Sequence, residues 1–504
     1  MRIIEIQSIL PLLIFVIPIA FSIPILTLGR NFKAFREWFA LAGLTVTLVI
    51  TSIIYQQVVT TEELRALVWH KWFYIDGLSV LMEFVVSIMS IIIILYSVKY
   101  VAHESPKAGE GRRLSLYYGL LVLSVGLMNW ICATNNLIML YVSLEASTLA
   151  TVYLVAFDWK RNSLEAGYKY LLLITVGVIF SLLGGILLYC VSGSSDALFL
   201  NRLGSIVPEI PRTIALVSCG LFIAGFGTKA GLIPFHAWLP DAHAEAPTPI
   251  SVLLSGVIIK MGAYALARTV TVFAPYFREV VVFMAIIGSI TMILGIIMAL
   301  IQDDLKRLLA YSSVSEMGFI VTGLGLGTYL GIYGGLFHLV NHTIMKGLLF
   351  FCSGAFLYAM GSRKISELRL MPKKMLVTSF CFLVAALAIG GMPPFNGFMS
   401  SLTLFLALGE SDLLWASIIL IVAGFLTLVA LIWAGYRIFW TKPVPQLVPL
   451  ANPSSKEAKE VPPLMWGGML FLAILCLLFG VYPHVIYPLL NSAVNGILAI
   501  SAVP

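Results

Sequence analysis

The sequence predicts an all-α polytopic membrane protein with about fourteen transmembrane helices. Of its 504 residues, 60% are hydrophobic and only 11% are charged, a composition that an ordinary soluble fold does not have. Apolar runs of about 18 to 28 residues recur along the chain, and each can cross a hydrocarbon core of ~30 Å as a helix. The loops between them are too short to bury a soluble core of their own.

The expected spans follow one another closely from the N-terminus. No small-residue cleavage pattern follows the first apolar run, so we expect it to remain in the mature protein. The boundaries apply to within a few residues, and the spans are 9–28, 37–58, 76–100, 115–133, 136–157, 164–191, 212–233, 247–267, 279–301, 308–327, 330–359, 376–408, 413–436 and 463–483.

Lys and Arg are unevenly divided between the two sides that this order of spans defines. Of the 31 basic residues, 20 fall on one side, seven on the other and four inside spans. Because cytoplasmic loops carry the excess of basic residues, we expect a multi-pass protein of the cell membrane with both termini outside the cytoplasm. The net charge of +7 follows these loops and forms no single stripe, so no nucleic-acid partner is expected.

Two spans carry the same pattern of helix-breaking residues. The run Ala230–Phe235 reads AGLIPF, and Gly390–Phe395 reads GGMPPF. Proline inside a span removes a helical hydrogen bond, which membrane proteins tolerate where the break is buried or lines a cavity. Five spans lie between the breaks, so broken helices 7 and 12 run in opposite directions, as in inverted repeats. The alternative is a pair of ordinary proline kinks.

Charged residues also occur in the middle of spans, where each costs ~2.5–3.5 kcal/mol on insertion scales. Glu145 is flanked by the hydroxyl residues Ser143, Ser147 and Thr148. Lys229 precedes the first break, where we expect the freed carbonyls and the negative end of the half-helix to favour its ammonium. The alternative is that Glu145 and Lys229 form a purely structural ion pair.

Four more polar residues extend this pattern. Lys260 has only apolar neighbours in the sequence, so we expect its partner to come from another helix or from water. His338, His342 and Lys346 recur at i, i+4 and i+8, on one face of the eleventh span. The alternatives are a lysine bonded to carbonyl groups and histidines that only bond across helices.

These residue types suit proton transfer. The pKa of a free lysine is ~10.4, but desolvation favours the neutral amine and a nearby carboxylate favours the ammonium. Movement of Glu145 relative to Lys229 would therefore change the proton affinity of the lysine. Histidine, with an ordinary pKa of ~6.5, can relay protons between such groups.

No cofactor and no metal are expected. The six cysteines show no C-x-x-C spacing, and two histidines on one helix lack a third metal ligand. No glycine-rich phosphate loop or cysteine cluster is present. Whether the protein belongs to an enzyme is left open, because any redox energy would have to come from partner subunits.

Three motifs identify a family resemblance. The run 226–249, FGTKAGLIPFHAWLPDAHAEAPTP, resembles the hallmark of the antiporter-like subunits shared by respiratory complex I, Mrp sodium/proton antiporters and membrane-bound hydrogenases. The runs 304–315 (DLKRLLAYSSVS) and 341–350 (NHTIMKGLLF) resemble two further signatures of these subunits. Together the resemblance covers about residues 76–440.

The resemblance implies a single membrane domain over 1–504. Helices 1–3 would occupy 1–110, a first five-helix repeat (helices 4–8) 111–270, an inverted second repeat (helices 9–13) 271–440, and helix 14 with the C-terminus 441–504. It also implies a charged axis at mid-membrane depth. Glu145 and Lys229 would be its gating pair, Lys260 its bridging lysine, and His338, His342 and Lys346 its eleventh-helix relay. That relay is closest to the relay of the D-type subunit of Mrp antiporters and of hydrogenase-type relatives.

The sequence departs from the family pattern after the second break. Where the family usually has Lys or Glu, this chain has the neutral Ser401. The terminal proton site of the second half-channel would then be absent, displaced or supplied by water or a neighbouring subunit. Glu316, in the tenth span, could compensate or could have only a structural role. The chain ends soon after span 14, so the lateral helix of the largest complex I subunit is not expected.

The function expected from these residues and this resemblance is ion translocation. The chain would conduct protons, with exchange for sodium left open, beside other membrane subunits of a respiratory or antiporter complex. One alternative is a free-standing proton-coupled solute transporter. The other is a structural subunit that has lost pumping, in keeping with Ser401.

Overall fold

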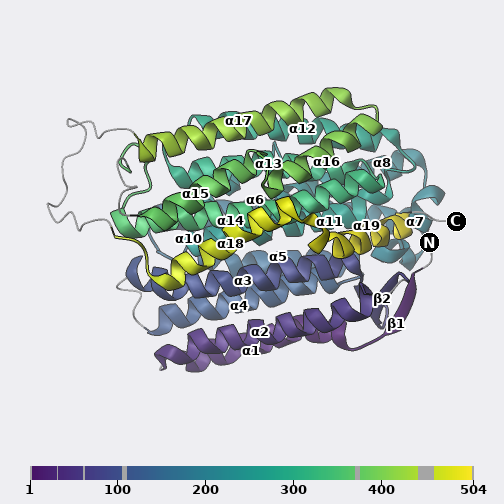
Figure 1. The fold of residues 1–504 in the computed structure, drawn as a ribbon. Coiled ribbons are helices and arrows are strands. Elements are labelled where there is room, and N and C mark those ends of the chain that lie inside the picture. The colour runs from purple at the N-terminus through teal and green to yellow at the C-terminus, as the bar shows by residue number, and fades with distance from the viewer. Residues whose placement is uncertain are drawn as a thin grey trace.

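The computed structural model describes residues 3–30, 32–60, 63–104, 111–368, 375–440 and 459–501 as a bundle of roughly parallel and antiparallel helices (Figure 1). The first part contains β1 (Ile4–Gln7), α1 (Leu10–Leu28), α2 (Lys33–Val58), β2 (Arg65–Trp69), β3 (Phe73–Ile75), α3 (Gly77–Glu104), α4 (Gly111–Ala133), α5 (Leu137–Val155), α6 (Arg161–Ser192), α7 (Leu203–Ile206), α8 (Arg212–Ala230) and α9 (Trp238–Glu245).

The second part begins with a helix built from three segments. These are α10 (Thr248–Leu253), the π-helical turn η5 (Leu254–Ile258) and α11 (Ile259–Thr269). The remaining helices are α12 (Arg278–Leu300), α13 (Leu305–Gly325), α14 (Tyr329–Met360), α15 (Leu376–Ile389), α16 (Asn396–Glu410), α17 (Leu414–Phe439), α18 (Pro463–Val481) and α19 (Tyr487–Ser501).

The helices agree with the predicted spans to within a few residues. In the described ranges, 13 helical segments are long and apolar enough to cross a membrane. The twelfth predicted span is the exception, because it is divided into α15 and α16. The protein is therefore a multi-pass membrane protein, and β1 and α19 place the two ends of the chain at the same end of the bundle (Figure 1).

Both predicted breaks are present. After α8, Gly231 adopts a left-handed φ of 75° and its N–H bonds to the carbonyls of Gly227 and Thr228. After α15, Gly391 adopts a φ of 69°. A side chain is strained at such φ values, so glycine is the residue that ends both half-helices. Cis peptide bonds precede Pro234 and Pro394.

A small sheet at one end of the all-α membrane bundle was not predicted. β1 pairs with β2 in parallel, and β2 pairs with β3 in antiparallel register. The segment that forms β2 and β3 is apolar and aromatic but too short for a span, which suits short strands. We call the end of the bundle that carries this sheet the sheet end (Figure 1).

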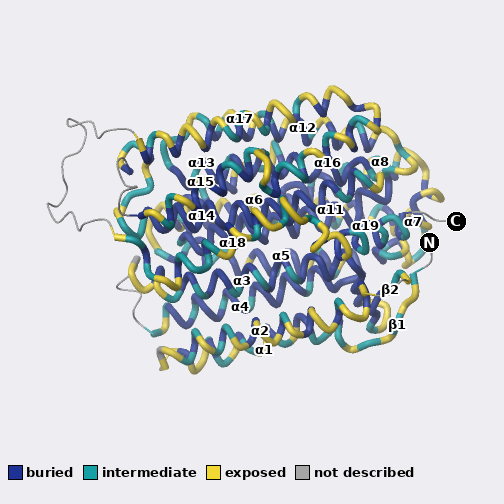
Figure 2. The backbone as a smooth tube through the Cα atoms, viewed as in Figure 1, coloured by how far each residue is buried: buried dark blue, intermediate teal, exposed yellow. Residues whose placement is uncertain are grey.

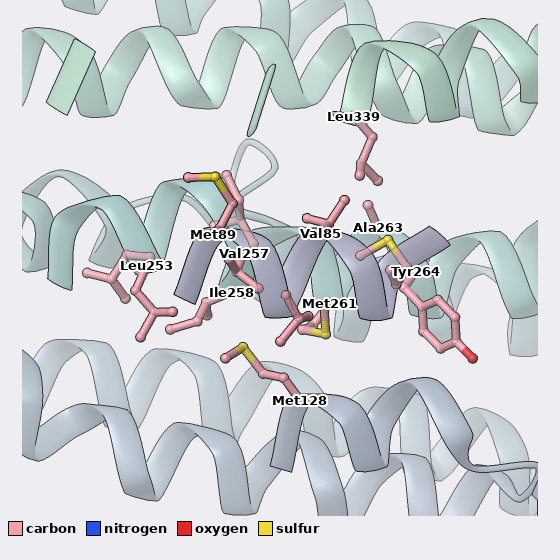
Figure 3. Close-up of a cluster of buried hydrophobic side chains, with 14 of the residues drawn as sticks. Val85, Met89, Met128, Leu253, Val257, Ile258, Met261, Ala263, Tyr264 and Leu339 are labelled. Atoms are coloured by element: carbon pink, nitrogen blue, oxygen red, sulfur yellow. The ribbon is translucent and has the colours of Figure 1, made fainter. Parts of the chain in front are cut away.

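Burial identifies the central helices. In the most apolar stretch of each span, all residues of Thr248–Val272 and 94% of those of α13 are buried, against 28% for α18. Figure 2 shows the same contrast, with exposed residues concentrated on the outer helices such as α17. Figure 3 shows part of the core, where Val85 and Met89 of α3 gather with Val257, Ile258 and Met261. Charged residues on the central helices are therefore enclosed by protein.

Candidate functional site

Lys229 lies in the last turn of α8 and is fully buried. Its ammonium donates to Thr148 Oγ1 at 2.6 Å and Ser147 Oγ at 3.3 Å, and it reaches the Leu144 carbonyl at 3.5 Å. All three acceptors belong to α5. Lys229 does lie at the carboxyl end of its half-helix, as expected, but its direct hydrogen-bond partners were not predicted, because the side chain crosses to the neighbouring helix.

Glu145 lies on the same helix as these hydroxyl groups but turns toward α6. Its Oε2 accepts a hydrogen bond from Thr175 Oγ1 at 2.8 Å, and its buried Oε1 has no hydrogen-bond partner in the described part of the chain. No ion pair joins Glu145 to Lys229 among the described residues. The alternative of a structural ion pair is therefore wrong, because the two side chains bind different partners.

Lys260 is fully buried in the first turn of α11. Its Nζ lies 2.7 Å from His342 Nδ1, so a partner does come from another helix, as expected. The Nζ also donates to the carbonyl of Ser255, in the π-helical turn just before α11. This local partner was not predicted. π-helical turns are frequent at functional sites because they free backbone groups from the regular ladder.

His338, His342 and Lys346 lie on one face of α14, each no more than 1% exposed. His338 Nε2 lies 2.8 Å from Glu316 Oε2, and its Nδ1 lies 3.0 Å from Ser400 Oγ. The rings of His338 and His342 are 6.4 Å apart between centroids. Lys346 donates to Ser312 Oγ at 2.5 Å and to the Leu309 carbonyl at 3.1 Å.

Helix α13 supplies partners that the sequence reasoning mostly missed. Ser312 bonds to Lys346, Ser313 Oγ lies 2.8 Å from Ser255 Oγ, and Glu316 pairs with His338. The sequence signal that could have revealed Ser312, Ser313 and Glu316 is their i, i+1 and i+4 spacing within one apolar span. After the second break, the serine that contacts the relay is Ser400, not Ser401.

These contacts form a line of polar groups, half-buried at Glu145 and Thr175 and buried elsewhere, through α6, α5, α8, α11, α14, α13 and α16. We call this line the axis. The described contacts do not join Lys229 to Lys260 directly, but their helices touch, since a Cβ added at Gly262 would overlap the Ala230 backbone nitrogen. The arrangement can hold protons at several sites and pass them between neighbouring nitrogen and oxygen atoms.

A polar cavity of about 560 Å³ opens at the end opposite the sheet end. Lys306 lines it and donates to the Ala246 carbonyl at 2.7 Å. His243, on α9, is fully buried against Phe350, and neither of its ring nitrogens has a hydrogen-bond partner in the described ranges. Lys306, which lines the cavity, and Lys260 and Lys346 of the axis are all close enough to His243 to interact with it electrostatically.

Within the described residues, no group of three or more His, Cys, Asp or Glu side chains is placed to hold a metal ion. A second buried charged group does exist near the sheet end. Arg268 forms two hydrogen bonds with Asp76, at 2.5 and 2.6 Å, and both side chains are almost fully buried. Sequence reasoning placed Arg268 outside the spans and did not consider Asp76.

Comparison with known proteins assigns the family. The profile described as "NADH:quinone oxidoreductase/Mrp antiporter, TM" matches residues 134–427, and the one described as "NADH-Ubiquinone oxidoreductase (complex I), chain 5 N-terminus" matches residues 68–108. NADH-quinone oxidoreductase subunit N of Desulforudis audaxviator is 32% identical over 90% of both chains. Na(+)/H(+) antiporter subunit A1 of Staphylococcus haemolyticus is 30% identical over 97% of this chain, which spans only 63% of that longer protein.

Solved structures share the fold over nearly the whole chain. A chain of the membrane-bound sulfane sulfur reductase, an archaeal respiratory membrane complex, superposes with a TM-score of 0.87 at 26% identity, covering 98% of this chain and 99% of its own. A chain of the Mrp complex from Dietzia sp. DQ12-45-1b gives 0.84 at 20% identity, covering 98% and 99%. Both are subunits of multisubunit assemblies.

Proposed function

The chain belongs to the NADH:quinone oxidoreductase/Mrp antiporter family of membrane subunits, and from this premise we propose that it translocates protons along its axis. It would do so as one subunit of a multisubunit Mrp, membrane-bound hydrogenase or complex I-like assembly. The observation that carries the proposal is the contact of Lys260 with His342, between two fully buried groups that can each hold a proton.

Each group has a role that its contacts support. Lys229 is held by neutral hydroxyls, so it can gain or lose a proton without breaking an ion pair. A shift of Glu145 toward it would favour the ammonium, and a shift away would release the proton. Lys260 would pass its proton to His342 directly, since their nitrogens are at hydrogen-bond distance.

The far end of the axis has its own acid. Glu316 and His338 would form the terminal proton site that Ser401 cannot provide, because their Oε2 and Nε2 atoms lie 2.8 Å apart and can exchange a proton. The two breaks support the proposed inverted repeats of 111–270 and 271–440. The polar cavity would give protons access to the axis through His243.

The relay of two histidines and a lysine favours a D-type Mrp subunit or a hydrogenase-type subunit within the family. The side that carries most of the Lys and Arg would face the cytoplasm, which would place both termini outside it. Protons are the favoured ion because most titratable groups of the axis are lysines and histidines, whose nitrogens bind protons, whereas sodium requires oxygen ligands. The flux test described next also asks whether protons are exchanged for sodium.

The test is ion flux in inverted membrane vesicles that contain the assembled complex, with Lys229→Ala and Lys260→Ala compared with wild type. Lys71→Ala, a change of an exposed lysine at the sheet end, is the matched control. We expect both axis variants to lose proton flux with assembly intact, and the control to keep it. Proton flux measured with and without sodium distinguishes sodium/proton exchange from proton conduction alone. Undiminished flux in both axis variants would leave a scaffold subunit and overturn the proposal.

A further inference from the structure

A second series of buried polar side chains, apart from the axis, begins at the residue just before α3 and continues along that helix. The residues recur at intervals of three, four, four, three and seven, so they share one face of the helix. Each is no more than 2% exposed. We call this series the α3 stripe, and its members are Asp76, Ser79, Glu83, Ser87, Ser90 and Ser97.

The α3 stripe faces α4. Near the sheet end, Ser79 Oγ donates to the Cys132 carbonyl at 2.6 Å, and near the other end Ser97 Oγ lies 2.9 Å from Tyr117 Oη. The opposite face of α3 carries Val85 and Met89, which belong to the hydrophobic cluster in Figure 3. The polar groups therefore follow the α3–α4 interface for most of the length of the helix.

The middle of the stripe is unsatisfied. Both carboxyl oxygens of Glu83 and the hydroxyls of Ser87 and Ser90 are buried with no hydrogen-bond partner in the described part of the chain. Among the residues that the structure describes, Asp76 and Cys132 are the titratable groups that interact with Glu83, and neither supplies a positive charge. A buried carboxylate without a donor or counter-ion is costly, and native proteins satisfy such groups with ordered water or a proton.

Arg268 and Tyr264 lie between the stripe and the axis on α11. Arg268 bonds to Asp76, to Ser79 Oγ at 2.9 Å and to Tyr264 Oη at 3.1 Å. Tyr264 lies four residues after Lys260 on α11, so the two residues share one face of that helix. Polar groups therefore extend from Lys260 toward the sheet end and meet the stripe one turn from Glu83.

We propose that Glu83, Ser87 and Ser90 hold a file of water molecules along the α3–α4 interface, and that Glu83 carries protons between this file and the sheet end. A protonated water of the file gives its proton to one carboxylate oxygen and becomes neutral. The carboxyl group later gives this proton to the next water, which becomes protonated, so atoms and charge are conserved. The Asp76–Arg268 pair would have a positioning role, because its charges already balance. The role in flux rests on the proposed function, whereas the hydration of Glu83 does not.

The first test measures flux in vesicles with the assembled complex. Glu83→Gln keeps the shape of the side chain but cannot titrate, and Glu209→Gln is the matched control at an exposed carboxylate. We expect Glu83→Gln to lower proton flux about 100-fold, as for loss of one positioned proton-transfer group, and the control to have no effect. If Lys260→Ala abolishes flux but Glu83→Gln does not change it, this inference fails and the proposed function stands.

The second test detects the carboxyl group itself. Infrared difference spectra of the wild-type complex after a pH jump should contain a carboxyl carbonyl band that shifts in D₂O and is missing in Glu83→Gln. A band that does not exchange with D₂O, or no band assignable to Glu83, would overturn the hydrated site. If Glu83→Gln prevents assembly, Glu83→Asp and the Ser87→Ala/Ser90→Ala double variant replace it. We then expect Glu83→Asp to keep part of the wild-type flux and the double variant to have less flux than wild type. Wild-type flux in both would contradict the proposal.

Discussion

Lys229, Lys260 and Lys346 are held by neutral atoms, whereas Arg268 is held by a carboxylate. This difference in partners distinguishes buried lysines that can release a proton from a buried ion pair that must stay charged. An ammonium bonded to hydroxyls, carbonyls or an imidazole can lose its proton and leave no unpaired counter-ion behind. The Asp76–Arg268 pair has no such freedom, because removal of either charge leaves the other one buried without compensation.

The pair allows a stability prediction. Arg268→Met should destabilise the protein by about 3–5 kcal/mol, because it leaves the Asp76 carboxylate buried and unpaired. The double variant Asp76→Asn/Arg268→Met should recover much of this loss, since the new amide would be neutral and could still accept from the N–H groups of Leu78 and Ser79. Thermal unfolding in detergent measures both. A double variant as unstable as the single one would contradict this interpretation.

Glu316 allows a prediction about flux. Glu316→Gln should lower proton flux about 100-fold, because it removes the carboxylate that faces His338 at 2.8 Å. Ser401→Ala is the control, since the serine that contacts the relay is Ser400. Flux assays in vesicles at matched expression compare the two. Equal flux in Glu316→Gln and wild type would remove Glu316 from the axis.

At the scale of helices, interruptions lie beside the buried lysines. Lys229 lies just before the break at Gly231, and Lys260 follows the π-helical turn η5. The proline motif predicted the first interruption from the sequence. It could not reveal the second, because Leu254–Ile258 contains no proline and its irregular turn depends on the helices packed around it.

The contact between α8 and α11 is tested by its glycine. Gly262→Ala would place a Cβ against the Ala230 backbone nitrogen, so the two helices would have to separate. We expect a loss of about 1–3 kcal/mol in stability and a matching loss of flux.

Gly220→Ala, in α8, is the control, because no atom lies within 4 Å of the place that its Cβ would take. It should be neutral or stabilising by up to about 1 kcal/mol. Thermal unfolding that ranks the two variants equally would contradict the close contact.

For the whole molecule, apolar runs were sufficient to predict the spans, apart from the divided twelfth, because backbone groups in the membrane must be satisfied within helices. Which residues would be buried and charged was also readable from the sequence. Their partners were not, since Thr148, Ser255 and Ser400 meet the lysines and histidines only through packing between helices. The small sheet and the Asp76–Arg268 pair were missed for the same reason.

Orientation is a further prediction at this scale. Lys160→Cys, in the basic loop before α6, and Glu209→Cys, before α8, should react with a membrane-impermeant thiol reagent from opposite sides of the membrane. The exposed Cys190 is first changed to serine so that it does not react. We expect Lys160→Cys to label from the cytoplasm. Labelling of both positions from one side would contradict the predicted span order.

The central claim is that one path runs through Lys260 and His342. The measurement that tests it most directly is proton flux in vesicles carrying the assembled complex with Lys260→Met, with His342→Ala and with both changes. Consecutive links of a single path act as a unit, so the double variant should be no worse than the more impaired single variant. Flux losses that multiply in the double variant, or full flux in all three, would contradict the account.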